Sequence, residues 1–272
     1  LEKRLELDRR VASVVLSNEE SSEYAKLYHP YDYEDFKKFA PALPLDDFFQ
    51  AVLGQVPDKV IVDEERFWQA ADQFYSEEAW PLLKATLILS VVNLSTSYLT
   101  EEIRVLSGAY SRALSGVPEA KDKVKAAYQL AQGPFKQALG LWYAHEKFSP
   151  EAKADVEKKV ATMIDVYKER LAKNDWLTPE TRDKAIVKLN VIKPYIGYPE
   201  ELPERYKDKV VDETASLFDN ALAFARVEIK HSWSKWNQPV DYKEWGMPAH
   251  MVNAYYNPQK NLIVFPAAIL QA

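Results

Sequence analysis

The sequence predicts a mainly α-helical protein whose last residues form a β-hairpin. Hydrophobic residues make up 47% of the 272 residues, as in a folded globular chain, and only 7 residues are glycine. Leu, Ala, Lys and Glu are abundant, and these residues favour helix over sheet. Apolar residues recur at helical spacing over long stretches, and strand character is expected only after Pro239.

Helical patterns follow one another in the first part of the chain. An opening helix ends at the segment 28–31, where Pro30 interrupts it. Shorter helical patterns cover residues 33–39 and 46–53, and another begins at Asp63. Residues 80–99 are apolar nearly all round, which predicts a buried central helix.

Two later helices begin with the same local signal. Ser149 is a hydroxyl N-cap followed by Pro150, and Thr178 followed by Pro179 repeats the arrangement. Apolar residues at helical spacing follow each start, and the linker 174–177 is short. We therefore expect two neighbouring helices that run antiparallel.

The last residues carry the pattern of a β-hairpin, after one more helical pattern at about 212–236. Residues 252–256 alternate in character with period two, as in a strand with two different faces. A turn is expected at 257–260, and 262–265 is a β-branched and aromatic run that Pro266 ends. From this pattern alone, the hairpin either only covers a core or also carries a binding function.

Charge and cysteine content restrict the class of protein. Lys and Arg total 35 against 41 Asp and Glu, a net charge of −6, and no basic tract is interleaved with aromatic residues, so nucleic acid is not an expected partner. The absence of cysteine excludes a disulfide framework and a thiolate metal site. It fits a bacterial cytoplasmic location, with a secreted or cell-surface location as the alternative.

No membrane segment is expected in this chain. The most apolar stretch, Ala85 to Leu94, is shorter than the ~20 residues that a bilayer-spanning helix needs. No signal peptide is visible. Because Leu1 lies inside a predicted helix, we expect further residues upstream.

Motifs of known chemistry are incomplete in this sequence. His145-Glu146 begins like the His-Glu-x-x-His zinc motif, but Ser149 stands where the second histidine would be. The other histidines, His29, His231 and His250, have no partner at ligand spacing. No phosphate loop and no nucleophile elbow is present. The residues therefore assign no catalytic group and no metal ligand.

Three blocks, in the same order along the chain, resemble the neprilysin-like zinc metallopeptidases. They are Ala138-Leu139-Gly140-Leu141-Trp142-Tyr143 with Phe148-Ser149-Pro150, then Asp175-Trp176-Leu177-Thr178 closing in Ile196-Gly197-Tyr198-Pro199, and Val252-Asn253-Ala254-Tyr255-Tyr256 with Phe265-Pro266-Ala267. The third block is the most specific. The lack of cysteine points to the bacterial endopeptidase O branch of the family.

The resemblance implies a zinc endopeptidase that cleaves oligopeptides inside an enclosed cavity. Residues 1–210 would belong to a mainly helical lobe that forms the cavity wall. Residues 211–272 would begin a thermolysin-like α+β catalytic lobe with a β-hairpin edge strand. The chain is expected to cross between the lobes more than once.

The resemblance also implies a substrate-binding role for the strand that contains Asn253, Ala254 and Tyr255. The Asn253 amide would hold the substrate backbone, the Ala254 carbonyl would accept a hydrogen bond from the leaving amine, and Tyr255 would line the adjoining subsite. The zinc ligands and the general-base Glu would lie beyond Ala272, in a continuation of the protein or in a separate chain. The alternative is a non-catalytic, helical peptide-binding or scaffold protein that keeps the family fold.

Overall fold

The computed structural model describes residues 1–272, which divide into two compact units. Unit 1 contains residues 1–122 and 212–238, and unit 2 contains residues 123–211 and 239–272. The chain therefore passes from one unit to the other three times. This division into compact units does not test the lobe boundary after residue 210, which stays a prediction. One of the three passages, between Val211 and Asp212, lies beside that boundary.

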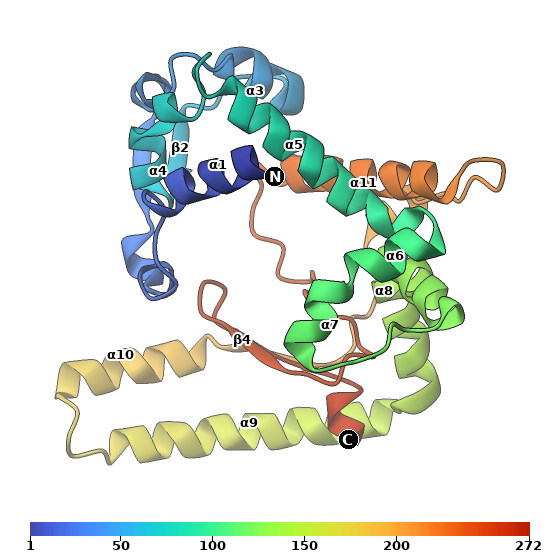
Figure 1. Ribbon diagram of the computed structural model, residues 1–272. Helices are drawn as coiled ribbons and strands as arrows, with labels where there is room; N and C mark the ends of the chain where they lie inside the picture. Colours follow the sequence, from blue (N-terminus) through green and yellow to red (C-terminus); the bar gives the residue numbers. More distant parts are fainter. The chain divides into compact units, whose positions relative to one another are not determined.

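Unit 1 is built mainly from helices (Figure 1). Its helices and strands are α1 (Glu2–Ala12), β1 (His29–Asp32), α2 (Tyr33–Phe36), α3 (Leu45–Leu53), β2 (Lys59–Val62), α4 (Glu65–Gln69), α5 (Trp80–Ser95), α6 (Glu101–Ser107), α7 (Ala109–Ser115) and α11 (Leu217–Ser234). Short 3₁₀ turns connect several of them. The mainly helical prediction is confirmed.

The core of unit 1 forms around its two strands. β1 and β2 pair antiparallel, with His29 opposite Val62 and Asp32 opposite Lys59. Tyr33, Phe36 and Val62 are buried there, and aromatic and aliphatic side chains pack around them. The Tyr33 hydroxyl donates a hydrogen bond of 2.6 Å to Asp46 at the start of α3, which fastens that helix to the cluster.

The prediction of a buried central helix at 80–99 is wrong for these 272 residues. α5 covers most of that range, but six of its large apolar side chains are 50–75% exposed: Trp80, Leu87, Ile88, Val91, Val92 and Leu94. α5 packs against α1 within unit 1. An apolar pattern all round a helix requires neighbours on every side, and these residues have too few of them. No helix of the structure has both the length and the hydropathy needed to cross a membrane.

Unit 2 combines long helices with a small sheet. Its helices and strands are α8 (Lys123–Lys147), α9 (Pro150–Ala172), α10 (Pro179–Asn190), β3 (Lys193–Gly197), β4 (Tyr255–Asn257) and β5 (Leu262–Pro266), with 3₁₀ turns η6 (Glu204–Asp208) and η7 (Ile269–Gln271). Buried Ala144, Phe148, Ala249 and Ala267 form the core between α8, α9 and the C-terminal segment.

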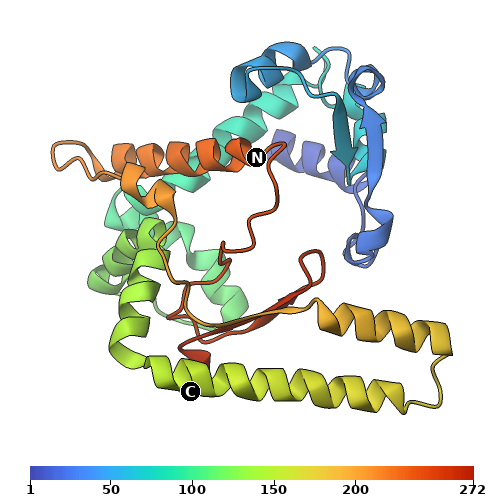
Figure 2. The same ribbon diagram turned by 180° about the vertical axis from the view of Figure 1, so that it is seen from behind.

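The predicted antiparallel pair of helices is confirmed in unit 2. The Ser149 hydroxyl caps α9 by accepting the Ala152 N–H at 3.2 Å, and Thr178 caps α10 by accepting the Thr181 N–H at 3.3 Å. Figures 1 and 2 show α10 returning along α9 in the opposite direction. Asn174 fixes the turn between them, because its Oδ1 accepts the Leu177 N–H at 2.9 Å.

Strands also occur before Pro239, contrary to the prediction. β1, β2 and β3 each have only four or five residues, and β1 and β3 each contain a proline. β3 lies where the sequence indicates the end of a helix, and it becomes a strand because it pairs in parallel with the distant β5. A pairing between segments so far apart in the chain has no local sequence signal.

Candidate functional site

The candidate site lies in the three-stranded sheet of unit 2, whose strand order is β3-β5-β4. β5 is the central strand, and its Leu262 and Val264 are buried. β4 pairs antiparallel with β5, with Tyr255 opposite Val264 and Asn257 opposite Leu262. β4 is therefore an edge strand, as the family resemblance implies, and the pair can be followed in Figure 1.

The predicted turn between the two strands is confirmed. The Asn257 side chain accepts the Lys260 N–H at 2.9 Å and closes the turn. Asn261 follows with a positive φ of 48°, a conformation that asparagine tolerates better than most residues. Its side-chain amide donates to the Lys188 carbonyl at 2.9 Å, so the hairpin is also tied to the end of α10.

The strand is shorter than the sequence predicts. β4 begins at Tyr255, so Val252, Asn253 and Ala254 lie just before it rather than in it. The β4–β5 register would bring Asn253 opposite Pro266 if the pairing continued. Proline has no N–H to donate to the ladder, so the pairing stops. The Asn253 N–H instead bonds to the Met251 carbonyl at 3.0 Å, which bends the chain locally.

Asn253 and Ala254 lie just outside the sheet, directly before its edge strand β4. The Asn253 side chain is exposed, and its Oδ1 accepts the N–H of the next residue, Ala254, at 2.8 Å. Ala254 is half-buried. Both residues therefore directly precede the edge strand β4. Their contacts with a substrate remain a prediction.

Tyr255 supports the sheet from within unit 2. Its ring packs on the cluster of Trp245, Leu262 and Val264. Its phenolic oxygen accepts the Gly246 N–H at 3.3 Å. The predicted lining of a subsite by Tyr255 is not tested by these contacts, which give the ring a structural role that the sequence did not indicate.

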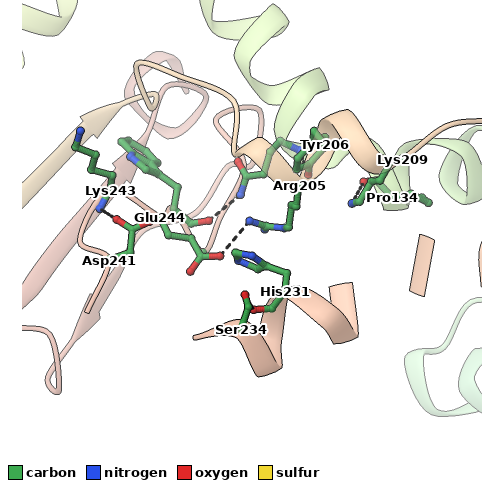
Figure 3. A network of polar contacts seen from close by, with 12 residues as sticks. Pro134, Arg205, Tyr206, Lys209, His231, Ser234, Asp241, Lys243 and Glu244 are labelled. Carbon is green, nitrogen blue, oxygen red and sulfur yellow. Dashed lines mark hydrogen bonds and ion pairs between the residues drawn. The ribbon is translucent and has the colours of Figure 1, made fainter. Parts of the chain in front are cut away.

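α8 has a kink, and polar side chains from other parts of unit 2 contact the helix there. Pro134 lies inside the helix, and Phe135 leaves the helical region with φ −110° and ψ 16°. A proline kink frees backbone groups that need other partners. Here the Lys209 ammonium donates to the Pro134 carbonyl at 2.6 Å (Figure 3). The Gln137 N–H donates to the Tyr206 hydroxyl at 3.2 Å.

The same network reaches the residues that lead to the candidate strand. Arg205 and Glu244 form an ion pair at 3.2 Å, and both side chains are largely shielded (Figure 3). The buried Gln137 side chain donates to the Trp245 carbonyl at 2.8 Å. These contacts fix Glu244 against η6 and Trp245 against α8. Sequence reasoning missed Gln137, because one glutamine on a helical pattern carries no signal of burial.

The described residues contain no group of three or more His, Asp or Glu side chains that could hold a metal ion. His145 makes an edge-to-face contact with Tyr198, with ring centroids 5.4 Å apart. His250 has a buried Nδ1 without a hydrogen-bond partner, and burial lowers its pKa from the usual 6.5. The donor set of a zinc site is therefore not found within these 272 residues.

Sequence comparisons identify a family and several relatives that this chain resembles. The sequence model of the N-terminal part of peptidase family M13 matches residues 1–199. A protein of Streptococcus gordonii named as a zinc metalloproteinase in the scaA 5′ region is 72% identical over all 272 residues. A neutral endopeptidase of Lactococcus lactis is 42% identical over 98% of this chain. The chain spans about half the length of these relatives, 48% and 43%.

Two solved structures resemble this chain over nearly its whole length. The crystal structure of PepO from Lactobacillus rhamnosis superposes with a TM-score of 0.91 at 30% identity, covering 98% of this chain and 42% of that one. The zinc metalloprotease Zmp1 of Mycobacterium tuberculosis, in complex with an inhibitor, gives 0.89 at 25% identity over 99% and 41%. The neprilysin-like resemblance is confirmed: this chain belongs to peptidase family M13.

Proposed function

We propose that this chain is part of a zinc-dependent endopeptidase that cleaves oligopeptides in an enclosed cavity. In this proposal the chain supplies the strand that binds the substrate backbone. Relatives named zinc metalloproteinase and neutral endopeptidase support the reaction class. They are about twice as long as this chain, so the activity belongs to the longer protein.

The position of β4 at the edge of its sheet is the observation that carries the proposal. An extended peptide can pair with such an edge through main-chain hydrogen bonds that do not depend on its sequence. Asn253 and Ala254 come directly before Tyr255, the first paired residue of β4. A peptide substrate that pairs with the free edge of β4 and extends past Tyr255 would reach the polar groups of Asn253 and Ala254.

Each residue has a distinct proposed role. The Asn253 side-chain amide has an acceptor oxygen and two N–H donors. It can therefore accept a hydrogen bond from a peptide N–H and donate one to a peptide carbonyl. The small side chain of Ala254 leaves its carbonyl open to the leaving amine. Tyr255 borders the adjoining subsite while it holds the sheet together from behind.

The zinc ligands belong, in this proposal, to the part of the polypeptide outside these 272 residues. The absence of a donor cluster here and the twofold length of the relatives both support this arrangement. The exposed apolar side chains of α5 separately support contact with further protein, because such a face usually marks an interface.

The test uses the full-length protein and two amide truncations in the same hairpin. Asn253→Ala should lower kcat/KM for peptide cleavage about 5- to 150-fold, since removing one positioning hydrogen bond costs about 1–3 kcal/mol. Gln259→Ala is the matched control, because Gln259 is an exposed amide in the turn. Zinc content and unfolding should be unchanged in both variants.

The outcomes separate the two candidate functions. About one zinc per molecule and chelator-sensitive cleavage support the endopeptidase. A full-length protein that binds peptides but holds no zinc and cleaves nothing would instead be the non-catalytic binding protein. Equal activity of the Asn253→Ala variant and wild type would remove the substrate role of this strand.

A further inference from the structure

At Gly140, α8 lies very close to the backbone of the segment that precedes the candidate strand. Gln137, Gly140 and Ala144 form the buried face of this helix. A Cβ atom at position 140 would lie 2.7 Å from the backbone nitrogen of Ala249 and 3.1 Å from Cβ of Pro248. The first distance is far below van der Waals contact, so only glycine fits here without movement of the neighbouring chain.

The segment opposite Gly140 is held on its other side as well. The Ala249 carbonyl accepts the Ala268 N–H at 3.0 Å, and Ala249 is fully buried. Its backbone is therefore clamped between α8 and the residues that follow β5. Backbone at such a position cannot give way without disturbing one of the two neighbours.

This clamp lies only a few residues before Asn253. The Met251 N–H donates to the Pro248 carbonyl at 3.1 Å, and the Asn253 N–H donates to the Met251 carbonyl at 3.0 Å. Two consecutive turns thus connect the clamp at Ala249 to the candidate substrate contacts. A shift of the Ala249 backbone would therefore move Asn253 as well, because a short, hydrogen-bonded segment connects the two residues.

We propose that Gly140 is a positioning residue for substrate binding: the absence of a side chain there sets the place of Asn253 and Ala254 at the sheet edge. This inference rests on the proposed function. Gly140 touches no substrate and acts through residues 248–250. Misplacement of a binding group by about 1 Å can cost about 100-fold in rate, so a forced shift at Ala249 has a measurable effect.

The experiment compares the same substitution at two glycines of one helix in the full-length protein. Gly140→Ala forces the overlap, whereas Gly133→Ala is the control, because a Cβ at position 133 meets no atom of another part of the chain within 4 Å. Two competitive inhibitors are used as probes. A peptide phosphonate of four residues has a backbone that can pair with the strand, whereas acetohydroxamate offers a zinc-binding group without a peptide backbone.

Gly140→Ala should lower kcat/KM for peptides at least about tenfold and raise Ki of the peptide phosphonate by a similar factor. Its zinc content and its Ki for acetohydroxamate should stay at the wild-type values. Gly133→Ala should match wild type with both probes. A purely structural defect would not separate the two inhibitors in this way.

A second variant covers the case in which Gly140→Ala does not fold. Ala249→Gly introduces no overlap but frees the backbone of the clamped residue, and it should weaken the peptide phosphonate selectively. Equal loss of both inhibitors, or no loss with either, would overturn the inference while wild-type cleavage left the proposed function intact. A wild-type protein without zinc or cleavage would overturn both.

Discussion

The Tyr255 hydroxyl accepts a hydrogen bond from the backbone N–H of Gly246, with 3.3 Å between the two atoms. A Cβ atom at position 246 would lie 2.9 Å from that oxygen, so the glycine and the phenol fit together. The contact joins the first residue of β4 to the loop that precedes the candidate strand. It explains why a tyrosine, rather than a phenylalanine, suits this position.

The first prediction is a coupling between these two residues. Gly246→Ala should destabilise the protein, because the new methyl group overlaps the phenolic oxygen. Tyr255→Phe should cost about 1 kcal/mol for the lost hydrogen bond. In the double variant the overlap is absent, so the cost of Gly246→Ala should be smaller than in wild type. Urea unfolding of the four proteins measures this coupling, and strictly additive values would contradict it.

The second prediction concerns Gly197, at the end of β3. Its φ is +79°, and a Cβ there would lie 2.8 Å from the Phe148 ring. Gly116 has a similar φ of +66° but nothing within 4 Å of a Cβ. Gly116→Ala should therefore cost about 1–2 kcal/mol from backbone strain alone, and Gly197→Ala distinctly more. Thermal unfolding gives both values, and equal losses would show that the Phe148 contact is unimportant.

The third prediction is a pH dependence of stability from His250. Burial lowers its pKa in the folded state below 6.5, so the unfolded state takes up a proton first as the pH falls. Stability from this group is complete well above pH 6.5 and is lost as the pH falls from there toward the folded-state pKa. The slope is at most about 1.4 kcal/mol per pH unit.

Unfolding free energies between pH 5 and 8 check this prediction. His250→Asn should flatten the wild-type curve below pH 6.5, because asparagine takes up no proton in this range. An unchanged slope in the variant would assign the pH dependence to other groups.

The fourth prediction concerns the exposed face of α5. If the rest of a full-length protein covers it, a cysteine introduced at Val91 should react with a thiol reagent about 100-fold more slowly in the native than in the denatured protein. Val91 is 59% exposed in the present 272 residues. Peptide mass spectrometry identifies the labelled site. Reaction at a rate close to that of the denatured protein would show that the face stays open.

Some features of the protein could be predicted because their causes are local. The helix starts at Ser149 and Thr178 depend on hydroxyl groups that bond to N–H groups three residues away. The turn after β4 depends in the same way on Asn257 and Lys260. The family could be identified because its blocks of residues are themselves a property of the sequence.

Other features depend on contacts between distant parts of the chain. β3 exists because it pairs with β5, and β4 starts late because its register brings Asn253 toward Pro266. The exposure of α5 depends on which other segments pack against it. The apolar pattern of the helix does not identify those segments. The sequence likewise shows a glycine at 140 but not the clamped backbone of Ala249 that requires it.

The sequence by itself therefore determined the helical class, the helix starts, the hairpin turn and the family. Each of these follows from residues within a few positions of one another or from the residue types alone. Only the tertiary structure decided the sheet order, the length of the candidate strand and the fit of α8 against residues 248–250. These depend on the path by which the chain brings separated residues within a few ångströms, and steric and hydrogen-bond energies act only at that distance.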